Sequence, residues 1–287
     1  MQNVAIIMST AEVIMIFGFN TIGRNADKGL DYAIANGMGH LEIDLSNENA
    51  LVTTLDTARI ETLRQKAAQG NVRLSLHAPF DINLAESAPF IREGCLHYFK
   101  QCIHLAHCLQ ATHLTVHGGF CLGISDLHQV RSRALDALAD NLAELMKLCE
   151  KLDVMLALEN LNRIGKGEFF YLGDNTADLE LIFKRVPSPR LALCLDIGHA
   201  HTCEGVQVYL DRFAPRIISI HYHDNDGMED RHLDIGQGSV DWPAVAAYLT
   251  AISYAGPFIS ETLSDLPMAS MEKFMACNIH HGIHRIH

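Results

Sequence analysis

Short apolar runs recur along the chain, and most of them end on a side chain that can bind a metal ion. Seven runs end in this way, at Asp44, His77, His117, Glu159, Asp196, His221 and Glu261. Successive ends lie 25 to 42 residues apart, which is about the length of one strand and one crossover helix. The spacing therefore predicts parallel strands joined by helices.

Helix-forming stretches alternate with these runs, and a further strand is expected over 14–20. The predicted helices are 26–36, 56–69, 88–109, 126–151, 176–185, 204–214, 242–252 and 268–280. Eight strands and eight helices in alternation predict an α/β fold, a single-domain (β/α)8 TIM barrel. An open doubly wound sheet is the alternative, but no glycine-rich phosphate loop follows the first strand.

Side-chain size along the strands supports closure into a barrel. Residues two positions before the strand ends are mostly small, namely Ser75, Thr115, Ala157, Cys194, Ser219 and Ile259. The residues between are mostly apolar, namely Leu76, Val116, Leu158, Leu195, Ile220 and Ser260. Small side chains suit a narrow lumen, and apolar ones suit the face that packs against helices.

Composition narrows the class of protein. The 287 residues are 48% hydrophobic and 20% charged, so they can build one sizeable core. We treat residues 1–287 as one domain, with 1–12 as an N-terminal extension. A formal net charge of -12 disfavours a generally basic surface, so nucleic acid is not the expected partner.

Eight cysteines without a CxxC pair are typical of a reducing compartment, and we expect a cytoplasmic protein. The apolar N-terminus carries Glu12 and no Lys or Arg before Arg24, which does not match a signal peptide. No apolar run approaches the ~20 residues of a membrane helix, so no membrane association is expected.

The strand ends should converge at one mouth of the barrel, because all strands of a parallel barrel point the same way. The central group is predicted to be Glu159, Asp196, His221 and Glu261. Three carboxylates and one imidazole suit Mn²⁺, Mg²⁺, Fe²⁺ or Co²⁺ and tolerate Zn²⁺. Four ionisable groups together are costly to desolvate without a cation or mutual pairing, so we predict a divalent-metal site.

Other polar residues could extend this site or stand apart from it. The candidates for additional ligands are His77, His117, His199, Asp230 and His232. His40 and His113 lack this placement and are interpreted as hydrogen-bonded structural residues. Glu42 shares the inward parity of Asp44 and is a candidate for substrate contact.

Eight motifs spread over nearly the whole chain carry a family resemblance: GFNTIG, SLHAPF, TVHGGF, LENLNR, LCLDIGHAH, HYHDND, DRHLDIGQGSVDW and ISETL. With them the chain resembles the xylose isomerase-like TIM-barrel superfamily, which holds sugar (phosphate) isomerases and epimerases beside endonuclease IV. In its tagatose 3-epimerase-like branch, one divalent ion is held at the positions of Glu159, Asp196, His221 and Glu261. The resemblance places His199 and Arg231 at substrate oxygens, and His77 and His117 at either the ion or the substrate.

The endonuclease IV branch instead uses a three-zinc cluster. Its nine ligand positions are all filled here, by His77, His117, Glu159, Asp196, His199, His221, Asp230, His232 and Glu261. After the seventh-strand histidine that branch tends to read Asn-Asp-Ser-Lys, whereas His221 is followed by Tyr-His-Asp-Asn-Asp without the lysine. Arginine- and aromatic-rich loops of the kind that wedge into DNA are not evident either.

The leading hypothesis is a divalent-metal-dependent isomerase or epimerase of a small sugar, sugar phosphate or polyol, acting through a metal-bound enediolate. The ion would serve as a Lewis acid, and Glu159 and Glu261 would exchange the proton. The alternatives are an abasic-site endonuclease-like phosphodiester hydrolase with three zinc ions, and a dehydratase or lyase. A homodimer is compatible with such barrels, although no apolar surface stripe indicates one.

Overall fold

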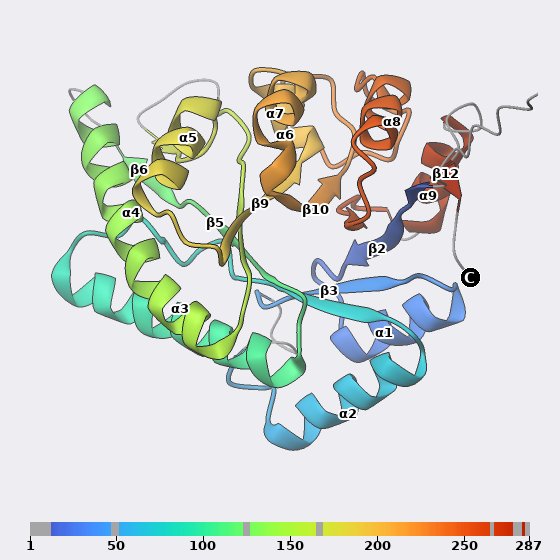
Figure 1. Ribbon diagram of the computed structural model, residues 1–287, viewed down its shortest axis with the longest axis horizontal. Helices are drawn as coiled ribbons and strands as arrows, with labels where there is room; N and C mark the ends of the chain where they lie inside the picture. Colours follow the sequence, from blue (N-terminus) through green and yellow to red (C-terminus); the bar gives the residue numbers. More distant parts are fainter. Residues whose placement is uncertain are drawn as a thin grey trace, which may run out of the picture.

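Eight parallel strands close into a barrel, in the ring order β10-β11-β2-β3-β4-β5-β7-β9 (Figure 1). The computed structural model describes residues 13–46, 52–122, 127–164, 169–264, 267–277 and 283–284. The barrel strands are β2 (Ile16–Asn20), β3 (His40–Asp44), β4 (Arg73–His77), β5 (Leu114–His117), β7 (Leu156–Glu159), β9 (Leu191–Asp196), β10 (Ile217–Tyr222) and β11 (Pro257–Ser260). The predicted (β/α)8 barrel is confirmed, and the open sheet is not observed.

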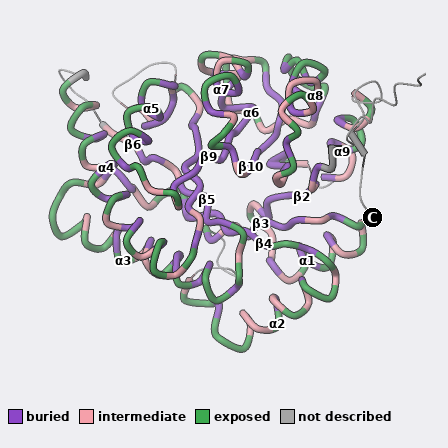
Figure 2. Tube along the Cα trace, in the orientation of Figure 1, coloured by how far each residue is buried: buried purple, intermediate pink, exposed green. Residues whose placement is uncertain are grey.

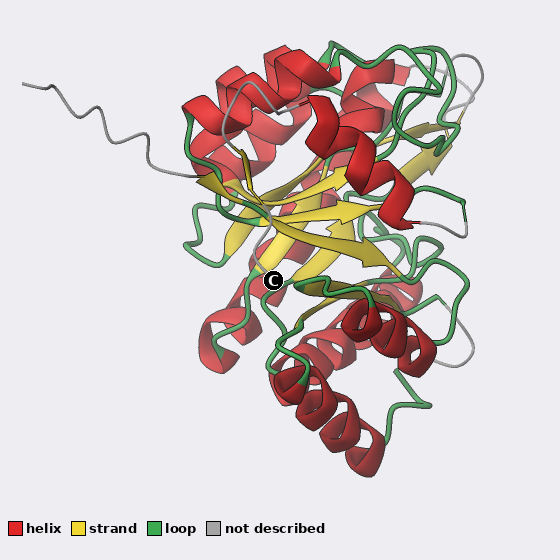
Figure 3. Ribbon diagram, turned by 90° about the vertical axis from the view of Figure 1, so that its right-hand side faces the viewer, coloured by secondary structure: helices red, strands yellow, loops and turns green. Residues whose placement is uncertain are grey.

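Helices surround the strands, which run in one direction through the middle of the molecule (Figure 3). They are α1 (Ala26–Ala35), α2 (Thr57–Gln69), α3 (Pro89–Leu109), α4 (Leu127–Leu152), α5 (Thr176–Arg185), α6 (Ile197–Thr202), α7 (Val206–Phe213), the short 3-10 helix η1 (Ala214–Arg216), α8 (Trp242–Ala251) and α9 (Pro267–Cys277). The predicted bounds agree closely, except that the unpredicted α6 precedes α7. The predicted extension 1–12 and helix residues 278–280 lie outside the described residues.

Asparagine and aspartate side chains mark where several helices begin. Asn25 accepts hydrogen bonds from two backbone amides of α1, and Asp56, Asn175 and Asp241 each accept one in α2, α5 and α8. Such caps satisfy amides that have no partner within the helix. They explain why the predicted helix starts lie so close to the observed ones.

The strands alternate between the barrel lumen and the outer core, as the pattern predicts. Leu76, Val116 and Leu158 are fully or almost fully buried and belong to one continuous apolar core with the helices. Ser75 and Thr115 are also buried, but their hydroxyls donate to Glu42 inside the barrel. Figure 2 shows buried residues along the strands and exposed ones on the outer helix faces.

Two small sheets outside the barrel were not predicted. The strands β6 (Phe120–Leu122) and β8 (Phe169–Tyr171) pair antiparallel, and β1 (Val13–Ile14) pairs with β12 (Ile283–His284). The predicted strand 14–20 is therefore divided between β1 and β2. Among the described residues, the structure contains no helix with the length and apolarity to cross a membrane.

Candidate metal centre

A cavity of about 570 Å³ opens where the barrel strands end. Polar groups from several strand ends line it, namely His77, His117, Glu159 and Glu261, together with His199 of α6. Its wall also carries the apolar or aromatic residues Ile22, Phe80, Leu161, Ile164, Tyr171 and Met228. Asp196 and His221 are fully buried behind this lining. The site lies at the C-terminal face of the barrel, where enzymes of this fold place their active sites.

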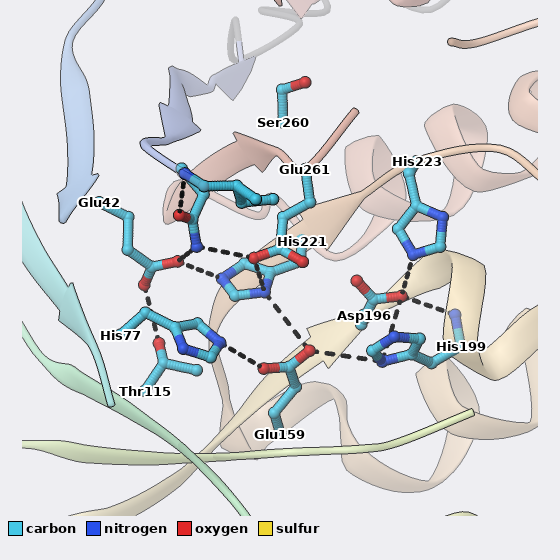
Figure 4. A network of polar contacts seen from close by, with 12 residues as sticks. Glu42, His77, Thr115, Glu159, Asp196, His199, His221, His223, Ser260 and Glu261 are labelled. Atoms are coloured by element: carbon cyan, nitrogen blue, oxygen red, sulfur yellow. Dashed lines mark hydrogen bonds and ion pairs between the residues drawn. The ribbon is translucent and has the colours of Figure 1, made fainter. Parts of the chain in front are cut away.

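Four side chains at the centre converge as the sequence predicts. Glu159, Asp196, His221 and Glu261 each offer a ligand atom within 4.8 Å of the others (Figure 4). Nδ1 of His221 lies 3.1 Å from Oε1 of Glu261 and 3.5 Å from Oε1 of Glu159. We refer to these four residues as the quartet.

The quartet contains buried polar atoms that make no hydrogen bond with any described residue. Glu159 Oε1, Asp196 Oδ2 and His221 Nδ1 are buried without a hydrogen-bond partner. Such atoms are uncommon in folded proteins because each forfeits its hydration. A divalent cation among them would satisfy all three, so the donor set of three carboxylates and one imidazole fits such an ion.

Neighbouring side chains shift the pKa values of Glu159 and His221 in opposite directions. Burial would raise the pKa of the Glu159 carboxyl, yet the neighbouring His117 and His221 hold it well below its usual range. Burial would likewise lower the pKa of His221, but Cys194 and Glu261 contribute to a value well above its ordinary range. The imidazole therefore retains a proton when no cation is bound, and a metal ion must displace it.

Glu159 also joins the quartet to two further histidines. Nε2 of His77 and Nε2 of His117 each lie 3.1 Å from Oε2 of Glu159. Burial opposes a charge on His77, but the hydrogen bond to Glu159 and the nearby carboxylates raise its pKa to about 10. His77, His117 and Glu159 form a second group of potential ligands, so the two oxygens of Glu159 face two different candidate positions.

A third group lies beyond Asp196 and includes a residue that sequence reasoning missed. It comprises His199, His223, Asp230 and His232. His223 follows β10 and is fully buried. It lies two positions after His221, and this spacing, which keeps side chains on one face of an extended strand, is the signal that could have identified it.

Two asparagines hold the ligands in place. Asn160 donates to the carbonyl of Asp196 and accepts from its amide, which clamps the end of β9. Asn20 donates to Oε1 of Glu261 at 2.8 Å and to Oε2 of Glu42 at 3.0 Å. Sequence reasoning quoted the motifs that contain both residues but gave neither a role.

The structure does not bring Glu42 and Arg231 into the cavity lining, in contrast to the expected substrate contacts. Glu42 is fully buried beneath the site, with Oε2 2.8 Å from Nε2 of His221. Arg231 has a half-exposed side chain, 3.4 Å from Oδ2 of Asp226. The inward parity of Glu42 is correct, but this residue lies too deep in the lumen, and Arg231 turns outward from its loop.

His40 and His113 lie inside the barrel, in agreement with their interpretation as structural residues. Their rings stack at 5.9 Å, and Nε2 of His40 lies 2.9 Å from Oγ of Ser75. Nε2 of His113 lies 3.6 Å from Oε1 of Glu42. His40, His113 and Ser75 thus add to the polar side chains around Glu42 inside the barrel.

The fold and the site define a TIM barrel with carboxylates and imidazoles clustered at its mouth. The family model described as xylose isomerase-like TIM barrel matches residues 30–275. The chain belongs to this family, and the resemblance found in its motifs is confirmed.

Individual relatives carry different descriptions. An uncharacterised protein of Methanocaldococcus jannaschii is 30% identical over 207 residues, which cover 70% of this chain and 68% of that protein. A solved structure of a D-tagatose 3-epimerase-like protein is 25% identical, with a TM-score of 0.80 over 92% of this chain and 97% of that chain. A probable endonuclease 4 of Mycoplasmoides gallisepticum is 25% identical over 206 residues, which cover 65% of this chain and 63% of that protein.

Proposed function

We propose that this protein is a divalent-metal-dependent isomerase or epimerase of a small sugar, sugar phosphate or related polyol. The observation that carries the proposal is the convergence of Glu159 and Glu261 on one position that also faces Asp196 and His221. The similarity to the D-tagatose 3-epimerase-like protein supports the same class of reaction.

The two glutamates would move the proton. When bound, a divalent cation supplies Lewis acidity that polarises a substrate carbonyl and its neighbouring hydroxyl. Glu159, as the carboxylate, would accept the proton on the carbon next to the carbonyl. Glu261 would return a proton to the resulting enediolate. The two carboxyl groups exchange these roles in the reverse reaction.

The remaining cavity residues would position the substrate. His77, His117 and His199 line the polar floor and can hydrogen-bond sugar hydroxyls or bind further ions. Phe80 and Tyr171 pack edge to face at 5.6 Å on the wall. Such an apolar wall limits the access of water to the enediolate, which would otherwise exchange its proton with solvent.

Deuterium exchange tests the proposal directly. The untagged, Mn²⁺-loaded protein would be incubated in D2O with a panel of ketoses, ketose phosphates and inosose-type polyols. We expect one substrate to gain deuterium at the carbon next to its carbonyl and to form its isomer or epimer. Glu159→Gln and Glu261→Gln should each lower the rate by about 10²- to 10⁴-fold. The exposed Glu61→Gln serves as the control, and near-normal turnover by Glu159→Gln would exclude the mechanism.

A second candidate function follows from a separate observation. His77 and His117 both contact the oxygen of Glu159 that faces away from the quartet, so the mouth could hold more than one ion. Clustered ions suit phosphodiester hydrolysis, and the relative described as a probable endonuclease 4 is consistent with it. Incision of abasic duplex DNA, abolished by Glu261→Ala, with no deuterium exchange on any sugar, would favour this candidate. Loss of one water from a substrate in D2O would instead indicate a dehydratase.

A further inference from the structure

The cavity wall beside His199 differs from what the family resemblance implies. The resemblance places both His199 and Arg231 at substrate oxygens. His199 lines the cavity together with Asp230, but the half-exposed Arg231 lies beside Asp226, outside the described lining. The position expected for the arginine is thus open to a donor from another element.

Tyr171 presents a hydroxyl group to this side of the cavity. It is the last residue of β8, it is half-buried, and it lines the cavity. Burial raises the pKa of the Tyr171 hydroxyl, and the negative charge of Asp230 adds to this effect while His199 opposes it. Such influences weaken with distance, so the hydroxyl lies toward Asp230 and His199. It makes no hydrogen bond with any described residue and can therefore bind a ligand.

Ring contacts fix this orientation of Tyr171. Its ring packs edge to face against Phe80 at 5.6 Å and against Phe169 at 5.2 Å. Alternate residues of a strand face opposite sides, and the intervening Phe170 packs under Arg131, whose guanidinium lies 5.2 Å from its ring. With Phe170 held on the outer side, Tyr171 faces the cavity.

Backbone hydrogen bonds fasten the end of β8 to the barrel. The amide of Leu172 donates to the carbonyl of Gly119 at 3.0 Å. The amide of Leu161, just beyond β7, donates to the carbonyl of Gly173 at 3.1 Å. The Tyr171 hydroxyl is therefore held in place before a substrate binds, which lowers the entropic cost of the contact.

We propose that the Tyr171 hydroxyl binds one hydroxyl group of the substrate away from the reacting carbonyl, and that this contact selects the substrate. This role rests on the isomerase or epimerase function proposed above, in which the quartet faces the carbonyl. The phenol is neutral and can both donate and accept, which suits a hydroxyl group. A phosphate at this point would instead meet the negative charge of Asp230.

Steady-state kinetics of Tyr171→Phe test this role, because the variant keeps the ring and its packing. Both proteins would be loaded with Mn²⁺ and assayed on the ketose that exchanges deuterium. They would also be assayed on its monodeoxy derivatives, each lacking one hydroxyl away from the carbonyl. We expect KM for the complete ketose to rise about 3- to 10-fold in Tyr171→Phe, as for the loss of one neutral hydrogen bond. The value of kcat should change by less than about twofold, because the contact is made equally in the ground state and the transition state.

The deoxy derivatives separate a hydrogen bond from a packing effect. With the wild-type protein, one derivative should show the same rise in KM as the variant shows with the complete ketose. With Tyr171→Phe, that derivative should show no further rise, since both changes remove the same contact. Equal additional losses on every derivative would overturn the assignment and leave Tyr171 as part of the wall.

Two further variants complete the test. Tyr248→Phe on α8 is the matched control and should keep the wild-type KM, because its hydroxyl lies beside Asp211 on the outer helices. Arg231→Gln distinguishes the two donors, and a raised KM in that variant alone would show that the arginine makes the contact. If the wild-type protein exchanges deuterium with no ketose, the proposed function fails and this role with it. Exchange with an unchanged KM in Tyr171→Phe overturns this role alone.

Discussion

Glu42 and His221 form a buried pair, with Oε2 of the carboxylate 2.8 Å from Nε2 of the imidazole. The contact leaves the other ring nitrogen, Nδ1, facing Glu159 and Glu261. Ser75 and Thr115 donate to the second oxygen of Glu42 and hold it in place. A carboxylate on the outer nitrogen of a histidine fixes its tautomer and makes it a stronger metal ligand. Glu42 therefore acts on the site through His221 rather than by touching the substrate.

Replacing Glu42 by glutamine should weaken metal binding while the cavity lining stays intact. The amide is close to the carboxylate in shape but carries no charge, so His221 becomes a poorer ligand. We expect the dissociation constant of the quartet ion to rise about 10- to 100-fold, measured by competition with a chromogenic chelator. Glu61→Gln on the exposed face of α2 provides the control. An unchanged dissociation constant in Glu42→Gln would reduce Glu42 to a packing residue.

The sequence predicted the barrel because each strand end carries a distinct polar residue, and a parallel barrel brings all ends to one face. The contact between Glu42 and His221 could not be predicted in this way. Its contact with His221 joins β3 to β10, which are separated by β2 and β11 in the ring, and no spacing along the chain encodes such a contact. His223 has the two-residue spacing from His221 that strand alternation would predict, but it lies one residue beyond the end of β10. The strands of β6 and β8 have three residues each, too few for a periodic signal.

Removing the ion should destabilise the folded protein. Without it, Glu159 Oε1, Asp196 Oδ2 and His221 Nδ1 remain buried without a hydrogen bond to any described residue. An ion at 1,000 times its dissociation constant stabilises the folded state by about 4 kcal/mol. For a domain of this size the melting temperature should then rise by roughly 8–16 °C, measured by calorimetry with and without a chelator. The Asp196→Asn variant should respond much less, and equal melting temperatures after verified metal removal would contradict the fit of the quartet to a cation.

Asp224 should matter for stability although its side chain belongs to none of the groups of potential ligands. Its carboxyl oxygens accept from the amides of Asn225, Gly236 and Val240 and from Nε1 of Trp242. Asparagine would place an amide group against some of these donors and leave them unsatisfied, at about 1–3 kcal/mol for each buried group. We therefore expect Asp224→Asn to lower the free energy of unfolding by about 2–4 kcal/mol in urea titrations.

The neighbouring Asp226 provides the comparison for this prediction. Its side chain is exposed and accepts from the amides of Met228 and Glu229 and from Arg231. Asp226→Asn should therefore change the free energy of unfolding much less than Asp224→Asn. Similar losses in the two variants would show that the buried bonds of Asp224 do not organise the loop between β10 and α8.

His40 should make the apo-protein sensitive to acid. Burial, reinforced by His113, lowers the pKa of His40 from 6.5 to about 3, and the nearby Glu42 only partly opposes this. In the unfolded chain His40 therefore takes up a proton near pH 6.5. In the folded protein it binds this proton only near pH 3. Because the unfolded state binds more protons between these values, stability falls as the pH drops through this range. The contribution of His40 is up to about 5 kcal/mol, at ~1.36 kcal/mol per pKa unit.

Urea titrations of the apo-protein between pH 7 and pH 4.5 measure this dependence. A chelator present throughout keeps metal release from adding to the acid effect. His40→Asn should reduce the loss of stability per pH unit by up to about 1.4 kcal/mol, whatever its stability at pH 7. His104→Asn, on the exposed side of α3, should keep the wild-type slope. Parallel pH profiles for wild type and His40→Asn would mean that His40 takes up its proton without unfolding the barrel.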